Sequence, residues 1–146
     1  MKSMKSIQKK YDWIGEFKNG FAIVRLNGKF GFINRKGKEL VQIKYEEAWN
    51  FNDGVAQVRL NGKYGFINKN GEEITSFKYD FVENFQNGFA IVKLNGKSGF
   101  INEDGKGITP LKYDEAWDFY KNGFAPVVLN GKKLSINQKG EEVKRK

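Results

Sequence analysis

One eleven-residue phrase recurs four times along the chain and constrains its fold more than any other feature. The copies read NGKFGFINRKG from Asn27, NGKYGFINKNG from Asn61, NGKSGFINEDG from Asn95 and NGKKLSINQKG from Asn130. The first three begin 34 residues apart, and one residue is inserted near Tyr120 ahead of the fourth. A repeat of this period predicts a solenoid, an array or a propeller, in which every copy supplies one supersecondary unit.

Each copy is predicted to contain β-strands joined by tight turns. In the second copy, VAQVRL (55–60) alternates between two kinds of position and is followed by Asn61-Gly62 and the return strand KYGFIN (63–68). An Asn-Gly pair between two such runs predicts a two-residue type I′ hairpin. The text NKNG then predicts a second turn, capped by its first Asn and ended by Gly. No stretch has the apolar period of a helix over ten residues.

The remainder of each copy is predicted to add further strand. EEITSF (72–77) is expected as a third strand, and KYDFVENF (78–85) as an irregular or short fourth one. The fold class is therefore all-β, a tandem repeat of β-hairpins or three-stranded meanders of about 34 residues, stacked as an open twisted array. The alternative is a closed four-unit propeller-like ring, in which the N-terminal half-repeat completes the last unit.

The repeat register also sets expected boundaries. A half-repeat with a basic lead occupies residues 1–16, and repeats 1 to 3 occupy 17–50, 51–84 and 85–118 of a single domain overall. A degenerate fourth repeat with a basic tail follows at 119–146. Its KLSIN text and Pro126 suit a terminal cap. Because proline has no N–H to donate, Pro126 is expected at an edge strand or a bulge.

Comparing copies of the first strand shows which face is buried. One set of alternate positions is constant, namely Ala22, Val24 and Leu26 and their counterparts Ala56, Val58, Leu60, Ala90, Val92, Leu94, Ala125, Val127 and Leu129. The other set varies, from Ile23 and Arg25 in the first copy to Pro126 and Val128 in the fourth. Since alternate residues of a strand point to opposite faces, the constant face is predicted to be core and the variable face to meet solvent or a partner. Gly31, Gly65 and Gly99 on the return strand predict a bulge or a backbone packed against a ring.

The phrase GKYGFINKNGEEI resembles the bacterial WG-repeat family, whose members carry a Gly-Lys-Trp-Gly-aromatic-Ile-Asp turn, a Lys-Tyr-Asp segment and an aromatic-x-x-Gly step. The resemblance extends from about Lys10 to Val143. The namesake tryptophan is replaced by Phe30, Tyr64, Ser98 and Lys133 or Leu134, and the turn Asp is Asn in every copy. The resemblance implies a tandem β-hairpin array with a binding or scaffolding role. It implies no catalytic residue.

Composition excludes several classes of function. The chain has no cysteine and no histidine, which removes disulfides, thiolate chemistry and the commonest general base and metal ligand. We therefore expect no enzyme, no cofactor and no metal site. Neither a signal peptide nor a membrane-spanning run of about 18 apolar residues is visible, so a cytoplasmic location is expected.

The net charge of +9 resides largely in the two tails. The tail residues are Lys2, Lys5, Lys9, Lys10, Lys144, Arg145 and Lys146; without them, 19 basic and 17 acidic residues remain. A Lys-Tyr pair also recurs in every copy, at Lys10-Tyr11, Lys44-Tyr45, Lys78-Tyr79 and Lys112-Tyr113. These features allow a nucleic-acid or nucleotide binder that stacks bases on the tyrosines. Alternatively, the tyrosines pack between copies while the lysine stems cover them.

The segment after each Lys-Tyr pair varies between copies. Two positions on one face read Trp13/Gly15, Glu47/Trp49, Phe81/Glu83 and Glu115/Trp117, so every copy places one large aromatic at one of them. The candidate partner-binding residues are Trp13, Glu47, Trp49, Phe81, Glu83, Glu115, Trp117 and Asp118. Tryptophan anchors among charged residues suit a protein interface, although the rings could instead fill gaps in the core. The leading prediction is a non-catalytic protein-binding module, such as an inhibitor or immunity-type binder; a structural spacer is a further alternative.

Overall fold

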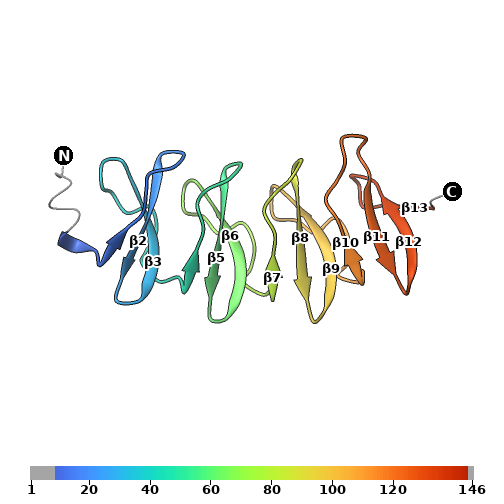
Figure 1. Ribbon diagram of the computed structural model, residues 1–146, viewed down its shortest axis with the longest axis horizontal. Coiled ribbons are helices and arrows are strands. Elements are labelled where there is room, and N and C mark those ends of the chain that lie inside the picture. Colours follow the sequence, from blue (N-terminus) through green and yellow to red (C-terminus); the bar gives the residue numbers. More distant parts are fainter. Residues whose placement is uncertain (1–8, 145–146) are drawn as a thin grey trace. The chain divides into compact units, whose positions relative to one another are not determined.

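The computed structural model describes residues 9–144, which are all β except for helical Lys9 and Lys10. Thirteen strands in this range form four antiparallel sheets (Figure 1). The first sheet contains β1 (Trp13–Ile14), β2 (Phe21–Leu26) and β3 (Lys29–Asn34); the second contains β4 (Glu47–Ala48), β5 (Val55–Leu60) and β6 (Lys63–Asn68). The third contains β7 (Phe81–Val82), β8 (Phe89–Leu94) and β9 (Lys97–Asn102); the fourth contains β10 (Glu115–Ala116), β11 (Ala125–Leu129), β12 (Lys132–Ile136) and β13 (Glu142–Lys144). The expected all-β tandem repeat is confirmed, and the first two sheets form one compact unit and the last two another, divided after Phe77.

The Asn-Gly hairpins form as expected. In the first sheet Asn27 has φ 52° and Gly28 has φ 80°, and both lie in the left-handed region that a type I′ turn requires. An acidic side chain fixes each hairpin, because Asp12 Oδ2 accepts a hydrogen bond of 2.8 Å from the Asn27 N–H. Asp80 and Asp114 accept the same bond from the Asn95 and Asn130 N–H groups, and Glu46 accepts one from the Gly62 N–H. The Asp of each Lys-Tyr-Asp segment, or the Glu that replaces it, therefore stabilises the turn of the following hairpin.

The third strand of each sheet precedes the hairpin in sequence. β4 pairs with β5, whereas the expected third strand at 72–77 forms only the isolated bridge Ile67–Glu73, so that prediction is wrong. The cause is Gly65, which lies so close to the Phe77 ring that a Cβ there would clash with it. The segment thus packs on β6 through Phe77 and does not run beside it, and the expected contact between glycine and a ring is confirmed at this position.

The N-terminal half-repeat completes the first sheet. β1 pairs with β2, with Trp13 opposite Arg25 and Ile14 opposite Val24. The strand that the ring alternative assigns to the last unit is therefore used in the first one. The fourth sheet takes its own first strand, β10, and gains β13 as an additional edge strand beside β12.

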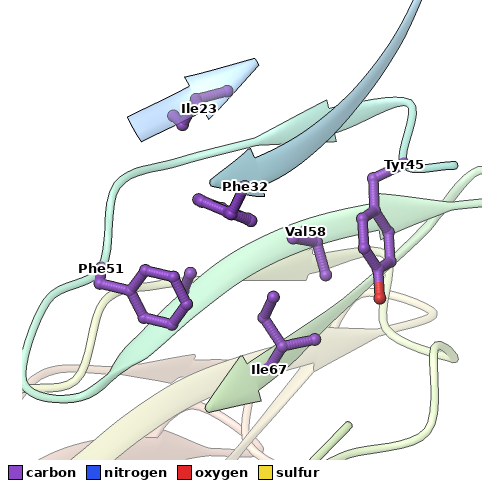
Figure 2. Packing of buried hydrophobic residues seen from close by; sticks show 7 residues of the cluster. Ile23, Phe32, Tyr45, Phe51, Val58 and Ile67 are labelled. Atoms are coloured by element: carbon purple, nitrogen blue, oxygen red, sulfur yellow. The ribbon is translucent and has the colours of Figure 1, made fainter. Parts of the chain in front are cut away.

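Both faces of the first sheet carry buried residues. Ala22, Val24 and Ile33 are fully buried on one face, as the constant pattern predicts. On the opposite face Ile23 and Phe32 are also buried, because they pack against Val58, Ile67 and other residues of the second sheet (Figure 2). The expectation that this second face meets solvent or a partner is therefore wrong for its Ile23 and Phe32 positions. It holds for Arg25, which is exposed on the same face.

A phenylalanine from the linking segment closes each of these cores. The Phe51 ring lies 4.8 Å from that of Phe21 and 4.9 Å from that of Phe32, and the Phe51 carbonyl accepts a hydrogen bond of 2.8 Å from Asn19 Nδ2. In the second unit, the Phe119 ring lies 4.5 Å from Phe89 and its carbonyl accepts a bond of 2.7 Å from Asn87. The same pair of contacts, a phenylalanine ring stacked in the core and its carbonyl bonded to an asparagine side chain, thus joins neighbouring sheets inside each unit.

Pro126 lies inside the fourth sheet, so its expected place at an edge or a bulge is wrong. β11 pairs with both β10 and β12, and Pro126 is opposite Ser135. The Pro126 carbonyl accepts a bond of 3.1 Å from the Trp117 N–H, and its nitrogen faces the same side. β10 ends at Ala116, so the regular β10–β11 ladder does not extend to the position where the proline lacks an N–H.

Candidate partner-binding face

In every sheet a row of three side chains crosses the variable face. The register places Trp13 opposite Arg25 and Arg25 opposite Phe30 in the first sheet. The equivalent rows are Glu47–Arg59–Tyr64, Phe81–Lys93–Ser98 and Glu115–Val128–Lys133. The row's third position is the column in which the Phe, Tyr, Ser or Lys stands. We call this row and the residues two positions along each strand the variable face.

Each sheet presents one large exposed aromatic on its variable face. The exposed fractions are 50% for Trp13, 41% for Trp49, 51% for Phe81 and 47% for Trp117, whereas most other rings in the sheets are buried. These four rings therefore do not fill gaps in the core, and that alternative is wrong. Their role in recognition stays a prediction. All eight candidate residues lie on the first short strand of a sheet or just after it, at Trp13, Glu47, Trp49, Phe81, Glu83, Glu115, Trp117 and Asp118.

The second sheet fills its variable face with its own side chains. Arg59 Nη1 contacts Glu47 Oε2 at 2.8 Å, and the Tyr64 hydroxyl donates to the same oxygen at 3.1 Å. The Arg59 guanidinium lies 5.8 Å from the centre of the Tyr64 ring, and the Trp49 ring lies 5.8 Å from the same ring. Burial and the bond to Glu47 raise the pKa of Tyr64. The Glu47 carboxylate is thus neutralised from within the sheet.

The fourth sheet leaves the equivalent position open. Val128 and Lys133 stand where the second sheet has Arg59 and Tyr64, and in the range that the structure describes Glu115 has no ion pair. A cavity of about 440 Å³ lies here, lined by Glu115, Trp117, Tyr120, Pro126, Val127, Val128 and Lys133. We call it the Trp117 groove. It combines an apolar floor, two aromatic rings and one charge of each sign.

Tyr120 is a groove residue that the sequence analysis did not select. It is 61% exposed and takes the position of Lys18, because its N–H bonds to the Phe124 carbonyl as that of Lys18 bonds to Phe21. The inserted residue lengthens the following loop from two residues to three, Lys121 to Gly123. The break in the repeat period near Tyr120 was the available signal.

A smaller cavity occupies the corresponding part of the first sheet. It has a volume of about 210 Å³ and is lined by Trp13, Gly15, Glu16, Lys18, Ile23 and Asn50. A Cβ at Gly15 would lie 2.8 Å from Trp13 Cη2, so the glycine lets the indole lie along the strand. The Trp13 ring thus extends over Gly15, the position that corresponds to Trp49 in the second sheet. The two tryptophans reach equivalent places from neighbouring positions on one face.

Two candidate carboxylates of the second unit influence one another. Burial raises the pKa of Glu83, and the nearby Asp118 carboxylate raises it further while Lys93 lowers it. Burial also raises the pKa of Asp118. Because the charged forms are the disfavoured ones, the folded unit gains stability as the pH falls through these raised values. The pair is an electrostatic cost to the fold that a cationic partner would relieve.

The Lys-Tyr pairs belong to the fold. The side chains of Tyr11, Tyr45, Tyr79 and Tyr113 are all buried, so their rings are closed to nucleotide bases and the stacking ladder is wrong. Glu39 accepts a bond of 2.8 Å from the Tyr11 hydroxyl and pairs with Lys10 Nζ at 2.7 Å, while Glu142 does the same for Tyr113 and Lys112 at 2.9 and 3.1 Å. Burial, followed by Glu73, raises the pKa of Tyr45 to about 12. Of the basic tail residues, 2, 5, 145 and 146 lie outside the described range.

Two kinds of feature are absent between residues 9 and 144. No group of three or more carboxylates that could hold a metal ion occurs in this range. No helix in the same part of the chain is long and apolar enough to span a membrane.

A sequence profile of the WG containing repeat matches four consecutive segments, residues 5–30, 30–64, 64–97 and 99–132. The chain belongs to this WG-repeat family. Within it, the WG repeats of this protein place Phe30, Tyr64 and Ser98 at the third position of the variable-face row, where the family phrase has tryptophan. The column that names the family thus lies directly across from Arg25, Arg59 and Lys93.

Solved structures similar to this WG-repeat protein include Kluyveromyces lactis Hsv2, with a TM-score of 0.52 and 12% sequence identity over 92% of this chain. A protein of unknown function from Bacteroides caccae has a TM-score of 0.36 and 18% identity over 91% of this chain. The chain spans 50% of the first structure and 59% of the second. The likeness to Hsv2 concerns the fold alone. A comparison with curated protein sequences finds no match.

Proposed function

We propose that this WG-repeat protein is a non-catalytic module that binds another protein through the variable faces of its sheets. The observation that carries the proposal is the large aromatic that each sheet exposes, at Trp13, Trp49, Phe81 and Trp117. Exposing an apolar ring to water is unfavourable, and burying the ring against a partner contributes favourable free energy to binding. Tryptophan with charged neighbours is also the composition found at the energetic centres of protein interfaces.

The difference between the constant core face and the variable face supports this proposal. The positions that build the core are constant across copies, whereas the exposed aromatic shifts between two positions and its charged neighbours change. Such variation gives each sheet a different local shape on the same backbone. A module of this kind suits an inhibitor or immunity-type binder that blocks a partner enzyme in the cytoplasm by covering it. The sequence has no histidine or cysteine with which to supply chemistry of its own.

Partner capture with paired variants tests the proposal. The wild-type protein, Trp49→Ala with Trp117→Ala, and the exposed turn variant Lys36→Ala would be immobilised and exposed to lysate of the native cells. We expect the double variant to stay folded, with a cooperative thermal transition, and to lose the protein that the wild type and Lys36→Ala both retain. Loss of the thermal transition in the double variant would overturn the proposal, as would unchanged capture. A chain that retains no protein in any form would act as a spacer.

A further inference from the structure

We infer that the Trp117 groove binds an arginine side chain of the partner protein. This inference rests on the proposed function and assigns one chemical group of the partner to one place on the surface. The groove is the cavity of about 440 Å³ on the fourth sheet, with Glu115 on one side, Val128 in the floor and the Trp117 and Tyr120 rings around it. The second sheet indicates the occupant, because it has the same strand register and its own Arg59 fills the equivalent position.

The second sheet shows how this face holds a guanidinium. Arg59 extends from the middle strand, pairs with Glu47 at 2.8 Å and lies 5.8 Å from the centre of the Tyr64 ring. The register is identical in the fourth sheet, where Glu115 is opposite Val128 just as Glu47 is opposite Arg59. Glu115 and Trp117 are retained, whereas Val128 replaces the arginine and Lys133 replaces the tyrosine. The space beside Glu115 therefore has the carboxylate and the neighbouring indole of an arginine site without the arginine.

The electrostatics of the groove favour a cation with a flat face. Within the described chain Glu115 has no ion pair, so its charge is available to a partner. Trp117 and Tyr120 are 47% and 61% exposed and offer ring faces to a cation. Arginine suits this site better than lysine because a planar guanidinium can pair with a carboxylate through two parallel hydrogen bonds and stack on an aromatic ring at the same time.

Lys133 adds a second requirement. It occupies the position of Tyr64, across Val128 from Glu115, so the groove carries opposite charges on its two sides. A lone cation would meet this ammonium, whereas an arginine followed closely by a carboxylate would satisfy both sides. The segment expected in the groove is thus an extended stretch of the partner with an arginine near an acidic residue.

Titration with a minimal arginine probe tests the inference on the full chain. The indole N–H signals of the three tryptophans would be followed by NMR while the peptide N-acetyl-Arg-Asp-amide is added, with N-acetyl-norleucine-Asp-amide as the control for apolar contact and for the carboxylate. We expect a saturable shift of the Trp117 signal with the arginine probe, at least about tenfold weaker with the norleucine analogue. Equal responses to the two probes would overturn the inference, whatever the capture experiment shows.

Two variants locate the site and a third controls for charge. Glu115→Gln keeps the shape and removes the charge, so it should abolish the response of Trp117. Val128→Arg supplies the missing guanidinium from within, as in the second sheet, so it should also abolish the response while the thermal transition is preserved. Glu103→Gln removes the same charge from an exposed turn of the same unit and should leave the response unchanged. A response that survives Glu115→Gln would overturn the inference.

The captured partner supplies the last outcome. We expect Val128→Arg to weaken capture of the partner at least about tenfold, because the groove is then already occupied. If Val128→Arg retains the partner fully while Trp49→Ala with Trp117→Ala loses it, the protein-binding proposal stands and the arginine site is overturned. If the arginine probe binds and no variant affects capture, both are overturned.

Discussion

The second and fourth sheets have the same hairpin register and opposite surface character. In the second sheet Arg59 and Tyr64 both bond to Glu47, and the Trp49 ring lies beside Tyr64. In the fourth sheet Val128 and Lys133 replace the arginine and the tyrosine, and a groove opens next to Trp117. Three strands are common to both, β4 to β6 in the second sheet and β10 to β12 in the fourth. The difference teaches that this repeat can change its surface without changing its backbone.

The separation works because core and surface side chains leave the strand on different positions. Val58 and Val127 are buried at equivalent core positions, while their neighbours Arg59 and Val128 point to the variable face. Replacing an arginine by a valine on the variable face removes contacts that are partly exposed, and those contribute little to folding.

The largest effect is expected where the two sheets differ in a buried ring. Phe66 is 1% exposed, and Ser135 holds the same position in the fourth sheet, opposite Pro126. Phe66→Ser should lower the free energy of unfolding by about 3–5 kcal/mol, the cost of losing a buried phenylalanine. Ser135→Phe should change it by less than about 0.5 kcal/mol, because no ring-sized space is filled or emptied. Chemical denaturation measures both, and equal losses would show that the fourth sheet is packed like the second.

A smaller effect is expected from the two tryptophans. The Trp49 ring contacts the Tyr64 ring at 5.8 Å, whereas Lys133 stands at the Tyr64 position beside Trp117. Trp49→Ala should therefore cost about 0.5–1.5 kcal/mol more than Trp117→Ala, which is the worth of one aromatic pair. Thermal unfolding of the two single variants gives the comparison. If Trp117→Ala is the more damaging substitution, the Trp117 ring supports the fold and is not kept for a partner.

Most of the framework of both sheets follows from the sequence. The Asn-Gly hairpins and the buried Ala22 and Val24 columns come from simple rules, namely turn chemistry and the period of two along a strand. The absence of a third strand at 72–77 does not follow from the sequence. It depends on the Phe77 ring packing over Gly65, and strand propensity does not show where one segment crosses another. The burial of Ile23 also depends on the next sheet in the unit, which no single strand reveals.

The site is less predictable than the framework. The sequence identifies Trp117 and Glu115 through their shifting positions, yet it does not show that Glu115 lacks the ion pair that Glu47 has. That difference depends on register, since only the pairing of Glu115 with Val128 places an apolar side chain opposite the carboxylate. Tyr120 lies at the groove because it takes the position of Lys18, which lines the smaller cavity of the first sheet.

The carboxylates that hold the buried tyrosines should also differ between the sheets. Glu142 bonds to Tyr113 and Lys112 at 2.9 and 3.1 Å, while Glu73 is 3.7 Å from Lys44. The bond from Tyr113, and then that from Lys112, lower the pKa of Glu142 below its ordinary 4.5. Its contribution is therefore fully present above about pH 5 and is lost as the pH falls through the lowered value. Glu142→Gln should cost up to about 1 kcal/mol at pH 7.

The same substitution in the second sheet gives the matched control. Glu73→Gln should cost less than Glu142→Gln at pH 7, because its ion pair is longer and exposed. Denaturation curves measured from pH 7 down to pH 3 should bring the Glu142→Gln protein and the wild type together. A difference that persists undiminished at pH 3 would show that the carboxyl acts through packing and not through its charge.

The smallest effect is expected at Ser98, which stands in the column of Tyr64 and Lys133. Its side chain is fully buried, and among the residues described its hydroxyl has no hydrogen-bond partner. A buried hydroxyl without a partner costs free energy, so Ser98→Ala should stabilise the protein by about 0.5 kcal/mol, with the lost contacts of the oxygen offsetting part of the gain. Ser135→Ala, on a half-buried serine of the fourth sheet, should give no such gain. If Ser98→Ala is destabilising by more than about 1 kcal/mol, the hydroxyl has a partner such as a buried water. The column of Ser98, Tyr64 and Lys133 then contributes to the fold in the third sheet, whereas in the second and fourth sheets it forms part of the surface.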